Sequence, residues 1–163
     1  MSEELLERPA VRRVREVLDA HADGASVIVL AETARTAEDA AASLGCALGA
    51  IVKSLVFRIG DQPVMALVAG DKRCDTKSLP SALGLTGKAK RADADMVQSA
   101  TGFTIGGVAP VGFPAALPMV IDESLGRFES IYAAAGHPHC VFATTLESLQ
   151  SMTGAEVSAN VAE

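Results

Sequence analysis

A single lysine interrupts the apolar run "AIVKSLVF" at residues 50–57. The run predicts a β-strand, and the two-residue period of a strand puts Lys53 on the same face as Ile51 and Leu55. Burying an ammonium group costs free energy unless the amine reaches a partner. Lys53 is therefore either an edge lysine whose stem carries its amine to solvent or a cation presented inside a cleft. The second interpretation makes it a candidate catalytic residue.

Residues 102–114, "GFTIGGVAPVGFP", contain four glycines and two prolines but no charged residue. The stretch is neither a GxGxxG fingerprint nor a P-loop, which needs a Lys-Ser/Thr pair. Paired glycines leave main-chain N–H groups accessible, and such groups can hold a carbonyl oxygen or an oxyanion. Gly106 and Gly107 are therefore candidate catalytic positions, with Pro110 stiffening the loop. The alternative is a buried bend that needs glycine only for packing.

Two of the three histidines lie in the tetrapeptide "GHPH" at 136–139, between two predicted strands. His137 is a candidate for hydrogen bonding to a ligand, and a polar turn is the alternative. Asp122, directly after another predicted strand, is a further candidate, with loop capping as its alternative. A metal site would need a third ligand that the sequence does not supply. The three cysteines are widely spaced without a CxxC pair, so we expect buried thiols, no disulfide and no cofactor.

The segment 72–91 is basic, whereas the rest of the chain is acidic. It holds six basic residues and one acidic residue, a net charge of +5. Because the whole chain has a net charge of −6, the remaining residues have a net charge of −11. A local basic patch on an acidic protein suits a partner that presents phosphates on one side. The alternative is a solvated surface of a helix and a strand. The candidate nucleic-acid-binding residues are Lys72, Arg73, Lys77, Lys88, Lys90 and Arg91.

The elements that must position these residues follow from hydrophobic periodicity, caps and turns. Helices are predicted at 9–21 (ended by Ala22-Asp23-Gly24), 36–45, 75–84, 93–102 and 145–154. Strands are predicted at 26–30, 50–60, 62–70, 87–92, 117–122, 130–135, 140–144 and 156–161. The second and third strands are joined at Gly60-Asp61, which predicts a β-hairpin. This mixture predicts one α/β domain over residues 1–163, with a mixed, largely antiparallel sheet flanked by helices.

Composition excludes several classes of protein. Hydrophobic residues make up 49% and charged residues 21%, which is typical of a globular chain. No uncharged apolar run reaches the length of a membrane span. The N-terminus is charged throughout and lacks the apolar core of a signal peptide. We therefore expect a cytoplasmic protein without a membrane partner.

Taken in order along the chain, these features resemble the YbaK/prolyl-tRNA-synthetase-associated editing domain family. The resemblance is carried by "VKSLVF" (52–57), "ATGFTIGGVAPVG" (100–112), "VID" (120–122) and "IYAAAG" (131–136). The segment "AETARTAEDAAASLG" (31–45) also fits the layout of the family. The resemblance covers roughly residues 26–152. The ordered combination is more specific than any one of these motifs.

This resemblance implies an aminoacyl-tRNA deacylase, which hydrolyses the ester between a wrong amino acid and its tRNA, chiefly tRNA-Pro. It implies a reaction without a metal or a protein nucleophile, in which the tRNA ribose hydroxyl and water do much of the chemistry. Lys53 would bind the phosphate of the terminal adenosine or orient the 3′ end. The backbone at Gly106 and Gly107 would hold the aminoacyl carbonyl. His137 is implied as a further catalytic residue. The residues implied to bind the substrate are Thr33, Ser54, Pro110, Asp122 and Gly136.

With 163 residues and no synthetase attached, the chain is expected to act in trans. Its expected substrates are mischarged tRNAs of the alanyl- or cysteinyl-tRNA-Pro type, and prolyl-tRNA synthetase is a further partner that the resemblance implies. One alternative is a non-catalytic module that binds tRNA or a synthetase on the same fold. Another is a small-molecule binder or an unrelated hydrolase, because fold does not fix function. The presence of both Lys53 and the glycine pair favours the enzyme.

Overall fold

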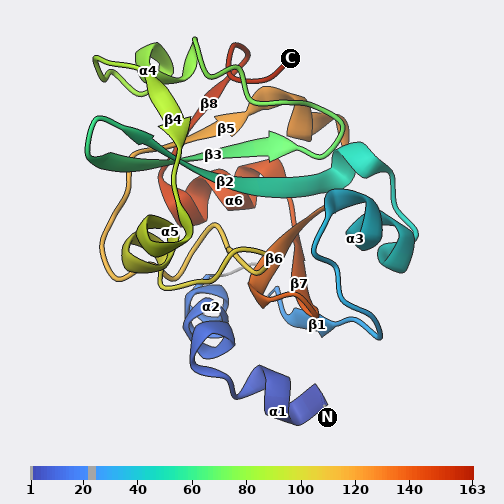
Figure 1. The fold of residues 1–163 in the computed structure, drawn as a ribbon. Coiled ribbons are helices and arrows are strands. Elements are labelled where there is room, and N and C mark those ends of the chain that lie inside the picture. Colours follow the sequence, from blue (N-terminus) through green and yellow to red (C-terminus); the bar gives the residue numbers. More distant parts are fainter. Residues whose placement is uncertain (1, 22–24) are drawn as a thin grey trace.

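A computed structural model describes residues 2–21 and 25–163 (Figure 1). Its strands are β1 (Val27–Val29), β2 (Ile51–Ile59), β3 (Gln62–Ala69), β4 (Ala89–Arg91), β5 (Met119–Asp122), β6 (Ile131–His137), β7 (Cys140–Thr144) and β8 (Glu156–Ser158). Its helices are α1 (Ser2–Leu6), α2 (Pro9–Asp19), α3 (Ala37–Leu44), α4 (Leu79–Ala82), α5 (Ala94–Thr101) and α6 (Leu146–Thr153). The predicted turn Ala22-Asp23-Gly24 lies outside the described residues.

The strands in this described part form one mixed sheet with the order β1-β7-β6-β2-β3-β5-β8, and β4 pairs with β2. The pairs β1/β7, β6/β7, β2/β3 and β2/β4 are antiparallel. The pairs β2/β6, β3/β5 and β5/β8 are parallel. The predicted fold class, a mixed and largely antiparallel sheet flanked by helices, is confirmed.

The sheet splits open along one edge of β2. At its start, β2 pairs with β6 over only two positions, Ile51↔Tyr132 and Val52↔Ala133. At its end, the same edge pairs with β4 from residue 57 to residue 59. Between these pairings β6 continues to His137 without pairing with β2, so the two strands diverge. A wedge therefore opens beside residues 53–56 of β2.

Local signals set most helix ends. Thr36, Asp93 and Thr145 accept hydrogen bonds at the N-termini of α3, α5 and α6. The same three helices end on left-handed glycines, at 45, 102 and 154. The sequence did not predict the short helix α1 or the 3-10 turns at 48–50 and 123–127. No helix in the described part of the chain is long and apolar enough to cross a membrane.

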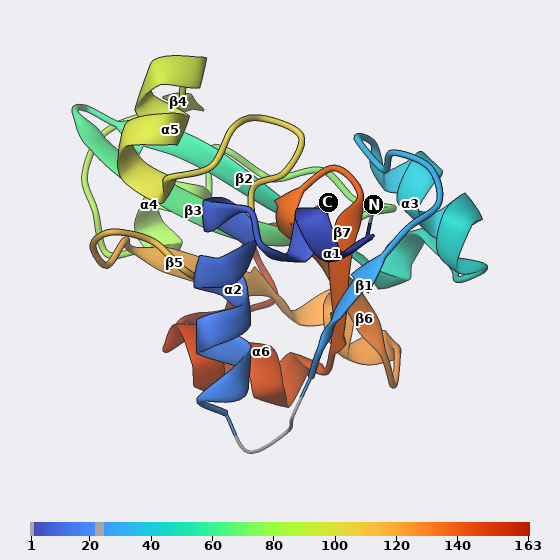
Figure 2. The same ribbon diagram turned by 90° about the horizontal axis from the view of Figure 1, so that it is seen from below.

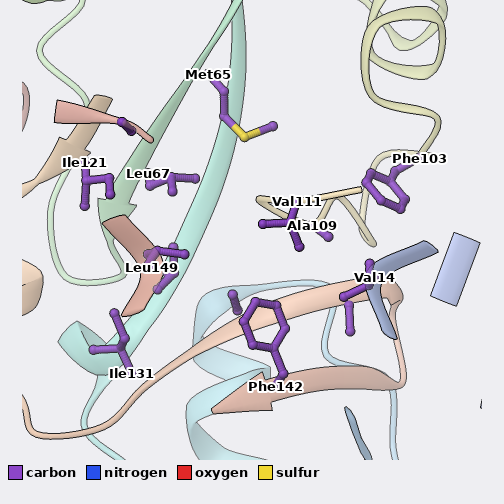
Figure 3. Close-up of a cluster of buried hydrophobic side chains, with 14 of the residues drawn as sticks. Val14, Met65, Leu67, Phe103, Ala109, Val111, Ile121, Ile131, Phe142 and Leu149 are labelled. Atoms are coloured by element: carbon purple, nitrogen blue, oxygen red, sulfur yellow. The ribbon is translucent and has the colours of Figure 1, made fainter. Parts of the chain in front are cut away.

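The two faces of the sheet bury different clusters. One face packs against α2, α6 and the loop that follows α5 (Figures 1 and 2). Figure 3 shows that loop entering the core, where Phe103, Ala109 and Val111 lie among side chains from α2 and the sheet. The other face packs against α4 and the C-terminal segment. We call residues 102–114 the glycine loop; its buried side chains belong to the core and pack against α2, whereas Thr104 and Ile105 are exposed.

Candidate functional site

A cavity of about 320 Å³ occupies the wedge between β2 and β6. Six consecutive residues of β2, 51–56, line it. Because neighbouring side chains of a strand point to opposite faces, a run of six lining residues means that the edge of the strand itself faces the cavity. The other walls come from residues 34–37 and Ala40, from Arg91, Ala92 and Val97, from the glycine loop, and from β6 and β7. Most of these residues are small or apolar.

The open edge of β2 directs main-chain groups toward this space. The Ile51 carbonyl accepts from Gly70, on the β3 side, whereas the Val56 carbonyl accepts from Ala92, on the β4 side. Main-chain groups alternate between the two edges along a strand, so those of Ser54 point into the wedge. The Ser54 Oγ is buried and has no hydrogen-bond partner among the described residues. The strand thus presents polar groups to a mostly apolar cavity.

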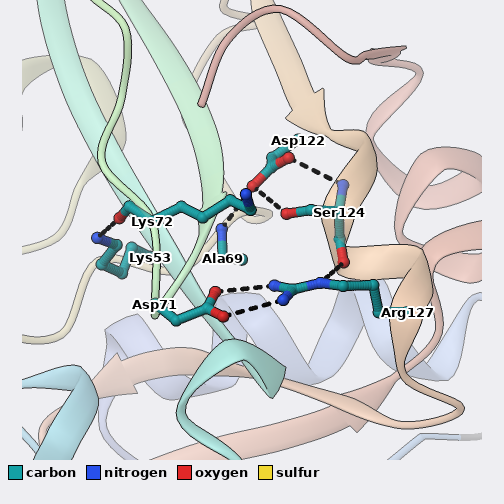
Figure 4. Close-up of polar contacts among 7 residues, drawn as sticks. All are labelled: Lys53, Ala69, Asp71, Lys72, Asp122, Ser124 and Arg127. Atoms are coloured by element: carbon teal, nitrogen blue, oxygen red, sulfur yellow. Dashed lines mark hydrogen bonds and ion pairs between the residues drawn. The ribbon is translucent and has the colours of Figure 1, made fainter. Parts of the chain in front are cut away.

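Lys53 lines the cavity and is half-buried, with its ammonium group donating to the Lys72 carbonyl (Figure 4). That contact satisfies one of three donors and leaves two to reach a ligand. Desolvation by burial lowers the pKa of Lys53, while the carboxylates of Glu38 and Asp71 oppose the shift. The ammonium is therefore both partnered and partly stripped of water, as a cation inside a cleft must be.

The two central glycines of the loop have different roles. Gly106 lines the cavity and has a φ of +101°, a conformation that favours glycine. Its N–H has no main-chain partner in the described part of the structure. The Gly107 N–H instead donates to the Thr104 carbonyl at 3.1 Å. A Cβ on Gly107 would lie 3.0 Å from the His137 main chain, so Gly107 is bare because the loop abuts β6 there.

Helix α2 holds both ends of the glycine loop through one residue. The Arg13 guanidinium donates to the Gly102 carbonyl at 2.6 Å, and its carbon lies 5.2 Å from the centre of the Phe103 ring. At the other end, a Cβ on Gly112 would lie 3.4 Å from the Arg13 main chain. These contacts fix the loop against a helix instead of leaving it free in solvent.

The predicted ligand-binding histidine lies behind the loop. His137 is not among the residues that line the cavity. Its Nδ1 accepts from the His139 main-chain N–H, and the two rings stack at 5.6 Å. Burial lowers the pKa of His137, and the nearby cations Arg8 and Arg35, with His139, lower it further. His137 is therefore a partnered imidazole whose environment disfavours the charged form.

Four other predicted substrate-binding residues also lie outside the cavity lining: Thr33, Pro110, Asp122 and Gly136. Thr33 is exposed and Pro110 is buried. Gly136 lets α2 approach, because a Cβ there would lie 2.9 Å from the Ala10 main chain. The Asp122 carboxylate accepts from Ala69 N and from both N and Oγ of Ser124, at 2.7–3.1 Å (Figure 4). Asp122 therefore caps the turn that follows β5, and β5 lies two strands from β2 in the sheet.

The basic segment does not converge on one place. Only Arg91 lines the cavity. Lys72 lines a second, shallower hollow beside Asp122, and Arg73 joins Glu163 through a pair of main-chain hydrogen bonds. Lys77 lies just before α4, and Lys88 and Lys90 are exposed around β4. Of the six predicted nucleic-acid-binding residues, Arg91 alone is therefore a residue of the cavity wall.

Three polar residues of the cavity wall were not predicted from the sequence: Arg35, Thr36 and Tyr132. Thr36 carried a signal only as a helix cap, and Tyr132 only as part of a strand. Arg35 lies between Ala34 and Thr36, outside any periodic apolar run, so no periodicity marked it. No group of three His, Cys, Asp or Glu side chains that could hold a metal is found in the described parts of the chain.

Comparison with known proteins identifies a family and several relatives of this chain. The model of the aminoacyl-tRNA editing domain family matches residues 31–152. YwhH of Bacillus subtilis is 34% identical over 123 residues, which are 75% of this chain and 77% of YwhH. EbsC of Enterococcus faecalis, named as a proposed Cys-tRNA(Pro)/Cys-tRNA(Cys) deacylase, is 29% identical over 123 residues, 74% of each chain.

One solved structure is similar to this protein over nearly the whole chain. A crystal structure described as a proposed trans-editing enzyme for prolyl tRNA synthetase superposes with a TM-score of 0.87 at 37% identity. The superposition covers 96% of this chain and 98% of that one. The residues matched by the family model include β2 with its open edge, the glycine loop and β6. The protein therefore belongs to the aminoacyl-tRNA editing domain family.

Proposed function

We propose that the protein hydrolyses the ester bond of mischarged tRNA in trans, removing a small amino acid from the 3′ end. One observation carries the proposal: Lys53, the open edge of β2 and the Gly106 main chain all line one cavity of about 320 Å³. Family membership supplies the reaction class, and the deacylase and trans-editing descriptions belong to relatives. We propose tRNA-Pro carrying alanine or cysteine as the substrate.

Water is the attacking group in this proposal. Neither cysteine nor histidine is among the described residues that line the cavity, and the Ser54 Oγ is buried. The oxygen of water adds to the ester carbonyl carbon, the bond to the ribose oxygen breaks, and that oxygen leaves with a proton. The protein contributes orientation and electrostatic stabilisation, which can supply most of the rate enhancement of an enzyme.

Lys53 and Gly106 have separate roles. Lys53 donates one hydrogen bond to the Lys72 carbonyl, and its other two N–H groups bind a phosphate oxygen of the terminal adenosine. This contact orients the 3′ end. The Gly106 N–H holds the ester carbonyl and stabilises the negative charge that develops on it. Gly107 supports this donor from behind, because its own N–H is bound to Thr104.

The shape of the cavity supports a small aminoacyl group. Alanines at 34, 37, 40, 92, 133 and 134 and valines at 52, 56, 97, 108 and 141 contribute much of its wall. A rigid apolar wall excludes side chains that are too large or too stiff. Binding alone separates side chains that differ by one methylene only about 10- to 200-fold, so rejection of prolyl-tRNA must be steric.

A deacylation assay tests this proposal. Alanyl-, cysteinyl- and seryl-tRNA-Pro would be incubated with the protein, with prolyl-tRNA-Pro as the correctly charged control. We expect hydrolysis of alanyl- or cysteinyl-tRNA-Pro and none of prolyl-tRNA-Pro. Lys53→Ala should lower kcat/KM about 100-fold, the effect of misplacing the reacting end of a substrate by about 1 Å.

Lys53 also joins β2 to the turn after β3 through its contact with Lys72, so a fold defect must be separated from lost chemistry. Lys53→Met keeps the aliphatic stem, and its melting temperature would be compared with that of the wild-type protein. If Lys53→Met melted like wild type and hydrolysed at the wild-type rate, Lys53 would have no role in the reaction. If no mischarged tRNA were cleaved while tRNA still bound, the non-catalytic module would be correct.

A further inference from the structure

The charged residues that line the cavity all have the same sign. In the described part of the chain they are Arg35, Lys53 and Arg91, and no carboxylate is among them. The chain as a whole has a net charge of −6, with 20 acidic residues. Three cations around one opening of an acidic protein concentrate positive potential there. The opening is therefore built to receive an anion.

Arg35 stands on a firmly attached wall of this opening. The segment before it is tied to the turn between β6 and β7, since Leu30 N donates to the His139 carbonyl and Ala34 N to the Pro138 carbonyl, both at 2.7 Å. Thr36 immediately afterwards caps α3. A Cβ on Gly106 would lie 3.9 Å from the Arg35 Cγ, so the stem of Arg35 crosses the bare glycine.

The Arg35 guanidinium is exposed and uncommitted. Among the described residues it has no hydrogen bond or ion pair, whereas Arg127 binds Asp71 with two hydrogen bonds of 2.8 and 2.9 Å. Arg12 and Arg15 both lie near Glu7. The positive charge of Arg35 reaches inward, because it contributes to the lowered pKa of His137. An arginine held at a cavity mouth without an acid is free for an external partner.

Arg35 and Arg91 lie on opposite walls of the wedge. Arg91 belongs to β4, which continues the β2 wall, whereas Arg35 is attached to the β6–β7 wall. Lys53 lies on the β2 edge between the two pairings of that strand. A strand of polynucleotide that enters the cavity would therefore meet a cation on each side and one inside.

We propose that Arg35 binds a backbone phosphate of the single-stranded 3′ end of tRNA as that end enters the cavity. The inference rests on the proposed function and adds a contact to it. The planar guanidinium can bind two phosphate oxygens at once, a geometry that lysine cannot reproduce. Because Arg35 lies across from Arg91, it fixes the path of the strand as well as its affinity.

The test measures binding of uncharged tRNA-Pro by wild-type protein and by Arg35→Ala at several salt concentrations. One lost phosphate contact on a single strand lowers the slope of log K against log salt by about 0.7. We expect that change, with roughly threefold weaker binding or more near physiological salt. Arg35→Lys keeps the charge and should retain the slope while losing part of the affinity. Arg12→Ala is the control, because Arg12 is an exposed arginine paired with Glu7.

A tRNA that lacks its 3′-terminal CCA locates the contact. It should bind wild type and Arg35→Ala equally well, since the phosphates that Arg35 touches are missing. An unchanged salt slope, or an equal loss of affinity with the shortened tRNA, would overturn the inference. Failure of the proposed function is distinguishable, because it would appear as no hydrolysis of mischarged tRNA by the wild-type protein. In an active protein, Arg35→Ala should raise KM several-fold and lower kcat by a smaller factor, because the contact contributes more to binding than to placement of the ester.

Discussion

The glycine loop and the basic segment 72–91 are both compositional outliers, and they reach the cavity very differently. The glycine loop enters the core as one body, held by Arg13 at Gly102 and Gly112. The basic segment runs through a loop, α4 and β4, and only Arg91 arrives at the cavity. Main-chain groups in a fixed loop keep their positions relative to one another. Charged side chains along a segment that turns repeatedly are instead placed on different parts of the surface.

The largest expected effect comes from adding one methyl group to the glycine loop. In Gly107→Ala the new Cβ would lie 3.0 Å from the His137 main chain, so the loop must shift away from β6. Such overpacking costs about 1–3 kcal/mol, and a displacement of about 1 Å at a reaction site can lower kcat about 100-fold. Deacylation rates and thermal unfolding would measure both effects.

Gly45→Ala is the matched control for that variant. Gly45 lies at the end of α3 with a φ of +68°, and a Cβ there would have no other atom within 4 Å. Alanine there costs about 1 kcal/mol through backbone conformation alone. Its activity per folded molecule should stay at the wild-type level. Equal loss of activity in both variants would mean that the glycine loop has no special connection to the reaction.

A smaller effect is expected from Arg13→Met, which keeps much of the stem but removes the hydrogen bond to Gly102 and the contact over Phe103. These interactions together stabilise the fold by about 1–2 kcal/mol, or about 2–8 °C in melting temperature for a chain of this size. Since Arg13 holds the loop, kcat should fall several-fold more than KM changes. Arg12→Met should leave stability and kcat almost unchanged, because Arg12 has only an exposed ion pair.

The basic segment offers a direct test of dispersal. Arg91→Ala should weaken tRNA binding and reduce the salt slope by about 0.7, the effect of one phosphate on a single strand. Lys77→Ala, on the exposed residue before α4, should leave that slope unchanged. Filter-binding titrations over a range of salt would compare the two. If both variants reduced the salt slope by the same amount, the segment would act as one continuous basic patch, contrary to this prediction.

The smallest expected effect concerns pH and the support behind the glycine loop. The pKa of His137 is lowered in the folded protein, mainly by burial. An unfolded chain therefore binds a proton at higher pH than the native one, and His137 contributes stability that is present above its unfolded pKa and lost as pH falls. His137→Asn should flatten the acid side of the stability curve. A histidine NMR titration with a midpoint at or above 6.5 for His137 would contradict this.

The sequence predicted what local chemistry determines. Thr36 with Gly45 and Asp93 with Gly102 mark helix ends through contacts within a few residues, and both helices begin and end close to the predicted positions. The hairpin of β2 and β3 follows from two apolar runs around Gly60-Asp61. Lys53 stood out because a cation in an apolar strand needs an explanation, whatever the fold.

The rest of the site depends on contacts between distant parts of the chain. The divergence of β6 from β2 decides where the cavity lies, and it depends on the pairing of two strands that are far apart in the sequence. Arg35 becomes a wall residue only because Ala34 pairs with Pro138. Asp122 is the last residue of β5 and Lys53 lies within β2, yet the order of the strands separates them. Sequence patterns describe elements, whereas the site is formed by register and strand order.

The long-range parallel pairing of β2 with β6 also bears on the order of folding. The hairpin of β2 and β3 closes a short loop and can form early, whereas Ile51 meets Tyr132 only after most of the chain has been made. Non-local pairings form slowly because a long loop must first be closed. The cavity should therefore be among the last features to appear on the ribosome. A growing chain would hold a stable hairpin well before it could bind the 3′ end of any tRNA.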